Sequence, residues 1–313
     1  MKVSESMKAM KIKQYGGPEQ LLEADVPKPT AKPGQVVVRI SAASYNPMDI
    51  KQASGLMRQF LPVEMPFIPG TDFCGTIDAL GQGVTGFKVG DEVFGCATGG
   101  GAYAEFVAVD AGNIAYKPRT LGPVEADSLA AVGQTAMQAL EQAHLGAGQT
   151  ILIHGAGGAV GGVAVQLAHQ LGAHVIASAD AESRARLLEY GADEVIDYKA
   201  TPFESVAKDV DVVLDGIGGD VQNRSFSVLK PGGILVAITQ PPSEEEAAKH
   251  KVRAIMLNTS VTTASLQALA AKIDAGDIRP FVGRTYPLSA AAQAWTDVQS
   301  QHIEGKIVFT VTA

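Results

Sequence analysis

The sequence predicts an α/β protein with a β-rich first domain and a second domain built on a parallel sheet. Up to about Val109, short β-type runs are separated by glycine or proline every few residues, as in a barrel-like domain. Beyond Pro118, apolar strand candidates alternate with helical segments, which is the pattern of βαβ units. Hydrophobic residues form 46% of the 313 residues and charged residues 19%, which supports a sizeable buried core.

The β-rich domain is predicted from five short runs bounded by turn-forming residues. The runs cover residues 9–12, 35–42, 75–80, 92–96 and 104–109. Pro27, Pro29 and Pro33 lie between the first two runs, in a stretch that has the composition of a linker.

The second domain is predicted from strands and helices in alternation. The strand candidates are residues 150–154, 173–178, 194–197, 210–215 and 233–238. The helix candidates are residues 123–141, 159–171, 182–190, 202–207 and 223–229. Because crossover helices cover both faces of such a sheet, we expect a parallel, doubly covered sheet.

The last seventy residues complete the prediction. Residues 241–250 are polar and indicate an exposed loop or a solvated helix, and helices are expected to end near Ala275 and to cover residues 289–299 around Trp295. A final strand is expected at residues 306–311. It has no obvious partner in the parallel sheet, which leaves a return to the first domain open.

Composition excludes several classes of function. The net charge is −8, and lysine and arginine are scattered rather than clustered as in a nucleic-acid surface. No stretch of about 20 apolar residues would span a bilayer, and residues 1–14 lack the apolar core of a signal peptide. Cys74 and Cys96 cannot form a disulfide framework. We therefore expect a cytoplasmic protein that binds neither nucleic acid nor membranes.

A glycine-rich turn from Gly155 to Gly162 joins a predicted strand to a predicted helix. Glycine permits a tight turn and lets backbone N–H groups approach a pyrophosphate, while the start of the helix offers unpaired N–H groups to the anion. The pattern predicts dinucleotide contacts from Gly157, Gly158, Ala159 and Val160. The alternative is a glycine-rich connection without a ligand.

The end of the next strand bears on the form of the cofactor. An acid there favours NAD by accepting from the ribose 2′-hydroxyl, and Ser178 takes that position when counted from Gly191. A hydroxyl can donate to a 2′-phosphate, and Arg184 can add positive charge. These residues favour NADP(H). Asp180 is the counter-argument, because a tighter turn would bring it to the ribose.

Eight motifs in this order carry a resemblance to a known family. They are residues 43–51 (ASYNPMDIK), 68–75 (IPGTDFCG), 87–93 (FKVGDEV), 101–106 (GAYAEF), 134–136 (QTA), 155–162 (GAGGAVGG), 191–198 (GADEVIDY) and 304–308 (EGKIV). The chain resembles the zinc-independent quinone oxidoreductases of the medium-chain dehydrogenase/reductase superfamily. The resemblance implies a GroES-like catalytic domain at residues 1–122, completed by 271–313, and a Rossmann domain at residues 123–270.

The positions that hold catalytic zinc in related enzymes lack zinc ligands here. The first position falls in the segment Tyr45-Asn46-Pro47, which has no cysteine, and Thr71 and Asp72 stand where a His-Glu pair is expected. A catalytic zinc site needs at least three protein ligands, so we expect no metal. Without a Lewis acid, reduction of an activated acceptor is easier than oxidation of an alcohol.

The resemblance also implies individual roles in the site. Asn46 and Asp49 would lie near the nicotinamide, and Tyr45 would donate to an oxygen of the acceptor. Tyr45 as an apolar wall residue and Asp49 as a structural anchor for its loop are the alternatives. Further cofactor contacts are expected from Thr135, Tyr198, Gly216, Ile217, Thr239, Gln240 and Lys306.

These observations predict an NADPH-dependent oxidoreductase that transfers hydride to quinones or α,β-unsaturated carbonyls. A 2-enoyl-thioester reductase is one alternative, and an NADPH-binding sensor or structural protein with little turnover is another. Relatives in this family are commonly dimers, so we expect a homodimer.

Overall fold

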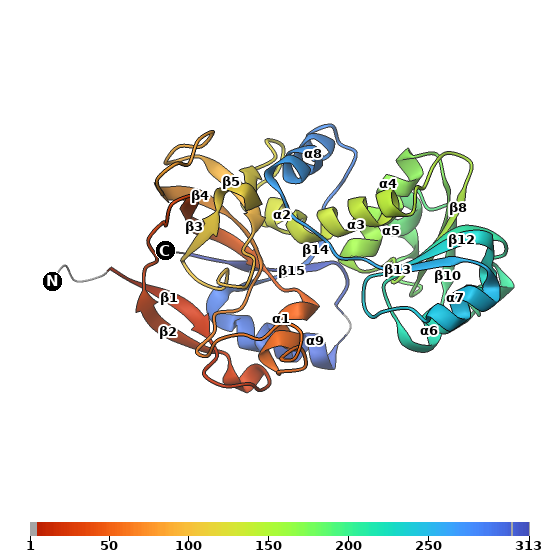
Figure 1. Cartoon of the computed structure of the whole chain (residues 1–313), viewed down its shortest axis with the longest axis horizontal. Coiled ribbons are helices and arrows are strands. Elements are labelled where there is room, and N and C mark those ends of the chain that lie inside the picture. The colour runs from red at the N-terminus through yellow and green to blue at the C-terminus, as the bar shows by residue number, and fades with distance from the viewer. Residues whose placement is uncertain (1–4, 302, 313) are drawn as a thin grey trace. The chain divides into compact units, whose positions relative to one another are not determined.

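The computed structural model describes residues 5–301 and 303–312, which form two compact units (Figure 1). The first unit comprises Met1–Ala131, Val261–Asp274 and Pro280–Ala313, and the second comprises Val132–Ser260 and Ala275–Arg279. The sequence-predicted domain borders, after residues 122 and 270, remain predictions; in the structure α2 (Pro123–Asp127) and α8 (Thr263–Asp274) belong to the first unit. No helix among the described residues is long and apolar enough to cross a membrane.

The first unit is β-rich, as expected. A seven-stranded sheet has the order β14-β15-β3-β4-β5-β7, with β6 also paired to β3, and a separate antiparallel pair joins β1 to β2. The strands are β1 (Ser6–Lys11), β2 (Leu22–Pro27), β3 (Gln35–Ser44), β4 (Asp72–Leu80), β5 (Glu92–Cys96), β6 (Phe106–Asp110), β7 (Ile114–Tyr116), β14 (Val282–Pro287) and β15 (Lys306–Thr310).

Helices of the first unit are short apart from α8 and α9. They are α1 (Pro47–Ala53), α2, α8, α9 (Ala291–Ser300) and the 3-10 turns η1 (Pro18–Gln20), η2 (Ala111–Asn113) and η5 (Leu288–Ala290). The core of this unit is filled by fully buried aromatic side chains, among them Phe73, Tyr103, Trp295 and Phe309. Tyr103 and Phe309 pack edge to face at 4.9 Å.

The final strand returns to the first unit. β15 pairs antiparallel with β3 and parallel with β14, beside which it lies in Figure 1. The structure also contains elements that the sequence did not predict. β2 occupies part of the stretch interpreted as a linker, and α1 and β7 were not predicted. Short elements of this kind are stabilised by their tertiary contacts more than by local propensity.

The second unit contains the predicted parallel sheet. Its six strands have the order β10-β9-β8-β11-β12-β13, and every neighbouring pair is parallel. They are β8 (Thr150–His154), β9 (His174–Ala179), β10 (Glu194–Asp197), β11 (Val210–Asp215), β12 (Leu229–Ala237) and β13 (Arg253–Met256). The chain order reverses between β8 and β11, and ligands of doubly wound sheets bind beyond the carboxyl ends of the strands at such a switch point.

The helices of the second unit differ in part from the predicted ones. They are α4 (Ala159–Gln170), α5 (Arg184–Glu189), α6 (Gly219–Ser225) and α7 (Glu244–His250), with 3-10 turns η3 (Phe203–Ser205) and η4 (Phe226–Val228). Residues 202–207 therefore form a single 3-10 turn, and residues 241–250 contain a helix. The predicted helix at 123–141 is two helices, α2 and α3 (Ala130–Gln142), and α3 crosses the division between the units.

Candidate active site

The glycine-rich turn connects β8 to the start of α4. Gly155 has a φ of 71°, a left-handed conformation that favours glycine. The N–H of Ala156 donates to the carbonyl of Ser178 at 3.1 Å, and that of Gly158 to the carbonyl of Gly155 at 3.0 Å. Gly158 is the N-cap of α4. The first turn of α4, where N–H groups lack intrahelical partners, therefore begins directly at the carboxyl edge of the sheet.

The turn is too tight for side chains at two of its glycines. A Cβ on Gly161 would lie 2.4 Å from the carbonyl oxygen of Gly155, and a Cβ on Gly157 would lie 2.7 Å from Oγ of Ser183. Glycine at these positions lets α4 pack against the turn, as a dinucleotide-binding turn requires. Gly158, Ala159 and Val160 are half-exposed at the helix start. The geometry therefore fits a pyrophosphate at the N-terminus of α4.

Two further loops meet the glycine turn at this edge. Gly216 and Ile217 follow β11, and a Cβ on Gly155 would lie 3.3 Å from the Cδ1 atom of Ile217. Thr239 and Gln240 follow β12, and both contact the next glycine of the β11 loop, since a Cβ on Gly218 would lie about 3 Å from their side chains. The structure thus brings Gly216 and Ile217 beside the turn, and Thr239 and Gln240 beside the β11 loop.

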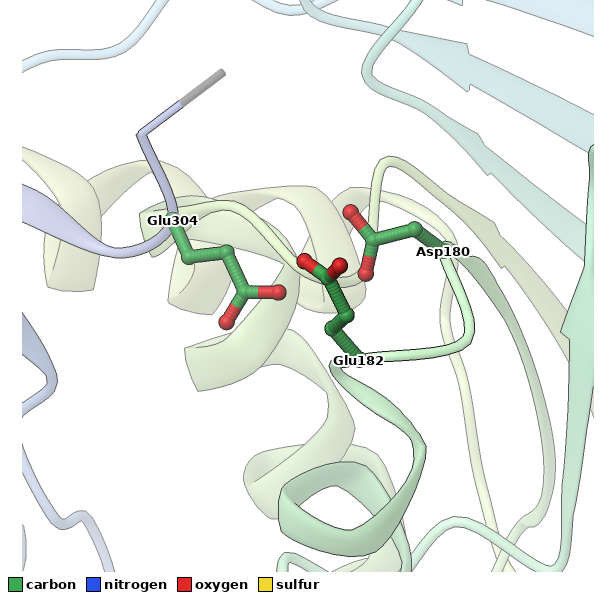
Figure 2. Close-up of side chains that lie close together, drawn as sticks. All are labelled: Asp180, Glu182 and Glu304. Carbon is green, nitrogen blue, oxygen red and sulfur yellow. The ribbon is translucent and has the colours of Figure 1, made fainter. Parts of the chain in front are cut away.

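The end of β9 presents acidic side chains next to the predicted serine. Ser178 lies within β9 and Asp180 directly follows the strand; both are 4% exposed, and Asp180 accepts from the N–H of Ser183 at 3.1 Å. Figure 2 shows Asp180 and Glu182 on the segment between β9 and α5, and their carboxylate oxygens lie within 4.8 Å of one another. Glu304, also labelled there, belongs to the first unit, where Gly305 separates it from β15.

The basic residues after β9 bind backbone carbonyls. A terminal nitrogen of Arg184 donates to the carbonyl of Val195 at 2.7 Å, and one of Arg186 donates to the carbonyl of Gly157 at 3.2 Å. Tyr198, which follows β10, donates its N–H to the carbonyl of Ala179 and leaves its side chain 56% exposed. Arg184 therefore supports β10, and its predicted contact with a cofactor remains a prediction.

Thr135 lies on α3 and is half-buried. Its hydroxyl oxygen is 3.3 Å from that of Thr259. At the end of β8, His154 is buried and its Nε2 lies 3.0 Å from Oγ of Ser225. Burial lowers the pKa of His154 to about 4, so its ring is neutral near pH 7 and fits a packed residue rather than a proton shuttle.

In the first unit, Lys306 and Asp72 form a buried ion pair at 3.0 Å, with 4% and 0% of each residue exposed. The side chain of Asn46 bridges them, because its Nδ2 donates to Asp72 at 3.0 Å and its Oδ1 accepts from Lys306 at 2.5 Å. Ser44 also donates to Asp72, at 3.1 Å. The ammonium of Lys306 is thus engaged inside this unit, and its predicted contact with the cofactor stays a prediction.

Asp49 is buried below Asn46 and caps α1. Its Oδ2 accepts from the N–H of Asn46 and from the hydroxyl of Tyr103, both at 2.8 Å. Burial raises the pKa of Asp49 to about 7. Burial, aided by the nearby charge of Asp49, raises the pKa of half-buried Tyr45 to about 12. The contacts of Asp49 fit the alternative interpretation of this residue as an anchor. The raised pKa of Tyr45 keeps its phenol protonated near pH 7.

Sequence reasoning missed three buried polar residues beside the predicted ones. Tyr103 supports Asp49, while Asp215 and Gln222 underlie the loops after β11 and β12. Asp215 had a local signal, because an acid that ends an apolar strand before Gly-Ile-Gly-Gly is placed to accept from the turn. Tyr103 had none, since its partner is 54 residues away.

Comparisons with known proteins agree with this architecture. Residues 32–119 match a family model described as an alcohol dehydrogenase GroES-like domain, and residues 190–309 match one described as a zinc-binding dehydrogenase. The chain is 32% identical to a chloroplast envelope quinone oxidoreductase homolog from Arabidopsis thaliana, over 96% of this chain and 98% of the relative. It is also 32% identical to the 2-methylene-furan-3-one reductase of Solanum lycopersicum, over 98% and 79%.

A solved structure supports the same assignment. The quinone oxidoreductase from Coxiella burnetii superposes with a TM-score of 0.93 at 34% identity, over 98% of this chain and all of that one. The predicted fold class, a GroES-like domain with a Rossmann domain, is thereby confirmed. The chain belongs to the quinone oxidoreductase-like family of the medium-chain dehydrogenase/reductase superfamily.

Proposed function

We propose that this protein reduces quinones or α,β-unsaturated carbonyls with a nicotinamide dinucleotide and without zinc. The observation that carries the proposal is the glycine cradle at the carboxyl edge of the parallel sheet, where Cβ atoms at Gly157 and Gly161 have no room. A bound nicotinamide dinucleotide supplies the hydride. The names of the relatives support the acceptor class, since they are a quinone oxidoreductase homolog and an enone reductase.

The residues at the zinc positions of related enzymes do not fit a zinc ion. Asn46 offers an amide oxygen that already accepts from Lys306, and the carboxylate of Asp72 is paired with the same ammonium. Zinc prefers thiolate, imidazole and carboxylate ligands. We therefore propose that metal analysis of the purified protein will find no stoichiometric zinc; one equivalent per chain would contradict the proposal.

The first unit supplies polar groups suited to an acceptor that becomes negatively charged. The raised pKa of Tyr45 keeps its hydroxyl protonated, so it can donate to a developing hydroquinone or enolate oxygen. Asn46 is held in one orientation by Asp72 and Lys306. Asp49 fixes the backbone of Asn46 through the cap of α1. Solvent supplies the proton that completes the reduction.

The form of the cofactor is a separate question. The preference for NADP(H) that Ser178 and Arg184 indicated remains a prediction. The geometry at the end of β9 supports a preference for NAD(H) instead. Asp180 follows β9 directly, where an acid accepts from a ribose 2′-hydroxyl. The carboxylate of Glu182 lies within 4.8 Å of it, so a 2′-phosphate placed here would be repelled. We therefore propose NAD(H) as the preferred form.

A titration with both reduced cofactors tests this preference. We expect NADH to bind more tightly than NADPH, and Asp180→Ser to shift the ratio of the two affinities toward NADPH by about tenfold. Asp193→Ser is the matched control, because this acid accepts from the N–H of Val175 at the amino end of β9. Tighter binding of NADPH by the unmodified protein would restore the interpretation of Ser178.

The acceptor is tested by steady-state assays with 1,2-naphthoquinone, a simple enone and crotonyl-CoA. We expect turnover with the first two. A preference for the thioester would favour the alternative enoyl-thioester reductase. If the protein binds the reduced dinucleotide but oxidises it with none of the three acceptors, the enzymatic proposal fails and a dinucleotide-binding sensor is favoured. Size-exclusion chromatography with light scattering tests the proposed homodimer.

A further inference from the structure

The loops that follow β11 and β12 share one buried polar anchor. Asp215, the last residue of β11, is fully buried, and Gln222 on α6 is 1% exposed. The Oδ1 of Asp215 accepts from the N–H groups of Ile217 and Gly218, both at 2.9 Å. Its Oδ2 accepts from Nε2 of Gln222 at 2.8 Å. The carboxylate therefore binds its own loop and the following helix at once.

Gln222 extends this anchor to the neighbouring loop. Its Nε2 also donates to the backbone carbonyl of Gln240 at 3.2 Å, and its Oε1 accepts from the side chain of Gln240 at 3.5 Å. Gly218, with a φ of 83°, lets the β12 loop approach the β11 loop. A Cβ at this position would lie 2.9 Å from the hydroxyl of Thr239. Two loops from adjacent strands are thus joined through one side chain.

Buried polar groups are costly unless every partner is in place, and a satisfied network fixes the backbone around it. The anchor itself is inaccessible, whereas Ile217 above it is 54% exposed and Gln240 is exposed. Asp215 and Gln222 can therefore affect a ligand only through the loops they hold. Asp215 pairs in register with His154 of β8, the residue that directly precedes the glycine turn.

We propose that Asp215 and Gln222 are positioning residues that hold residues 216–219 and 239–240 in register, so that one dinucleotide contacts both loops. The inference rests on the proposed function, because it assumes that this edge of the sheet binds the dinucleotide. Neither side chain touches the cofactor. Their removal should weaken binding of the whole dinucleotide without a comparable loss of fold.

The chain offers a matched control at the other end of the same strand. Gln149 pairs through its Nε2 with Asp211, the second residue of β11, at 3.4 Å, and Asp211 accepts from the N–H of Thr150 at 2.9 Å. Both anchors join a glutamine to an aspartate and a backbone N–H. Only the Asp215 anchor lies at the carboxyl edge. Gln222→Met and Gln149→Met therefore remove the same groups from opposite ends of one sheet.

The experiment measures the dissociation constant of NADH by its fluorescence, the melting temperature, and amide hydrogen exchange in the full-length chain. We expect Gln222→Met to raise the dissociation constant by about tenfold and to speed exchange in residues 216–219 and 239–240. Gln149→Met should lower the melting temperature to a similar extent and leave the dissociation constant within about twofold.

Three results bear on the inference in different ways. The inference would be overturned if Gln222→Met and Gln149→Met weakened NADH binding equally, or if folded Gln222→Met bound NADH as the unmodified protein does. If Gln222→Met does not fold, Asp215→Asn replaces it, since its remaining carbonyl can still accept from Ile217 and Gly218 while its Nδ2 faces the Nε2 of Gln222; faster exchange in residues 239–240 with unchanged NADH binding in that variant would equally overturn the inference. Failure of the unmodified protein to bind any dinucleotide would instead contradict the proposed function.

Discussion

At residue 49 a carboxyl group is buried where its charged form is disfavoured. Burial raises the pKa of Asp49 from its ordinary 3.8 to about 7, so the native state keeps a proton that the unfolded state has lost. The contribution of Asp49 to the unfolding free energy should therefore fall as the pH rises from about 4 to 7, by on the order of 1.4 kcal/mol per pH unit. Asp49→Asn, which resembles the protonated acid, should remove this slope.

Urea unfolding followed by tryptophan fluorescence measures the effect in the correct unit, because Trp295 is the only tryptophan and lies in the first unit. The comparison is the difference between Asp49→Asn and the unmodified protein at each pH. A difference that does not change between pH 4 and 7 would mean that Asp49 is ionised in the folded protein.

Lys306 and Asp72 give a second prediction at this scale. Lys306→Met leaves the fully buried carboxylate of Asp72 without its cation. We expect a loss of about 3–5 kcal/mol, because breaking one partner of a buried pair strands the other charge. Fluorescence-detected urea unfolding measures it. The double variant Lys306→Met/Asp72→Asn should recover part of the loss, and a single variant as stable as the unmodified protein would contradict a stabilising role for the pair.

At the scale of the element, His154 joins β8 to two segments of the second unit. Its Nε2 reaches Ser225 on α6 at 3.0 Å, and its ring packs edge to face on Phe203 of η3 at 4.6 Å. Burial lowers its pKa from 6.5 to about 4. The unfolded state therefore binds a proton that the folded state does not, and stability should be lost as the pH falls from 6.5 to 4.

The contribution of His154 to the unfolding free energy changes with pH in the opposite direction to that of Asp49, over an overlapping pH range. His154→Phe keeps an aromatic ring against Phe203, and Ser225 retains its bond to the carbonyl of Val221. The variant should lose less stability than the unmodified protein on acidification, by on the order of 1.4 kcal/mol per pH unit. Hydrogen exchange of the β8 amides measures it; identical pH profiles would contradict a neutral, buried His154.

The elements differ in how far the sequence predicts them. The apolar run of β8 and the glycine turn after it are defined locally, and the predicted strand at 150–154 matches the structure. Residues 202–207 were predicted as a helix but form one 3-10 turn, because Phe203 is anchored in the core and no amphipathic stretch continues beyond it. β13 completes the sheet edge through pairing with β12, which local propensity does not encode.

The candidate site shows the same division. Residues of the glycine turn were predicted because strand, turn and helix start are contiguous. The partners of Lys306 are 234 and 260 positions away, so no local pattern could reveal the network with Asp72 and Asn46. The sequence offered both Ser178 and Asp180 as the residue that meets the ribose. Because β9 ends at Ala179, the structure shows that Asp180 is the one that directly follows the strand.

At the scale of the whole molecule, the position of β15 governs the order in which the chain can be assembled during synthesis. β15 lies inside the seven-stranded sheet, between β14 and β3, rather than at its edge. The first unit therefore stays incomplete until residues 306–310 leave the ribosome. All residues of the second unit precede Pro280, and a unit whose residues are all available can fold first.

Removal of residues 306–313 should consequently act on one unit. We expect fluorescence of Trp295 to report a loosened first unit, while amide protection of β8, β9 and β11 persists. Equal loss of protection in both units would show that they fold as one. During translation, the β3 edge that later receives β15 is exposed for the time needed to make more than 250 further residues, which makes this edge the expected point of contact for chaperones on the nascent chain.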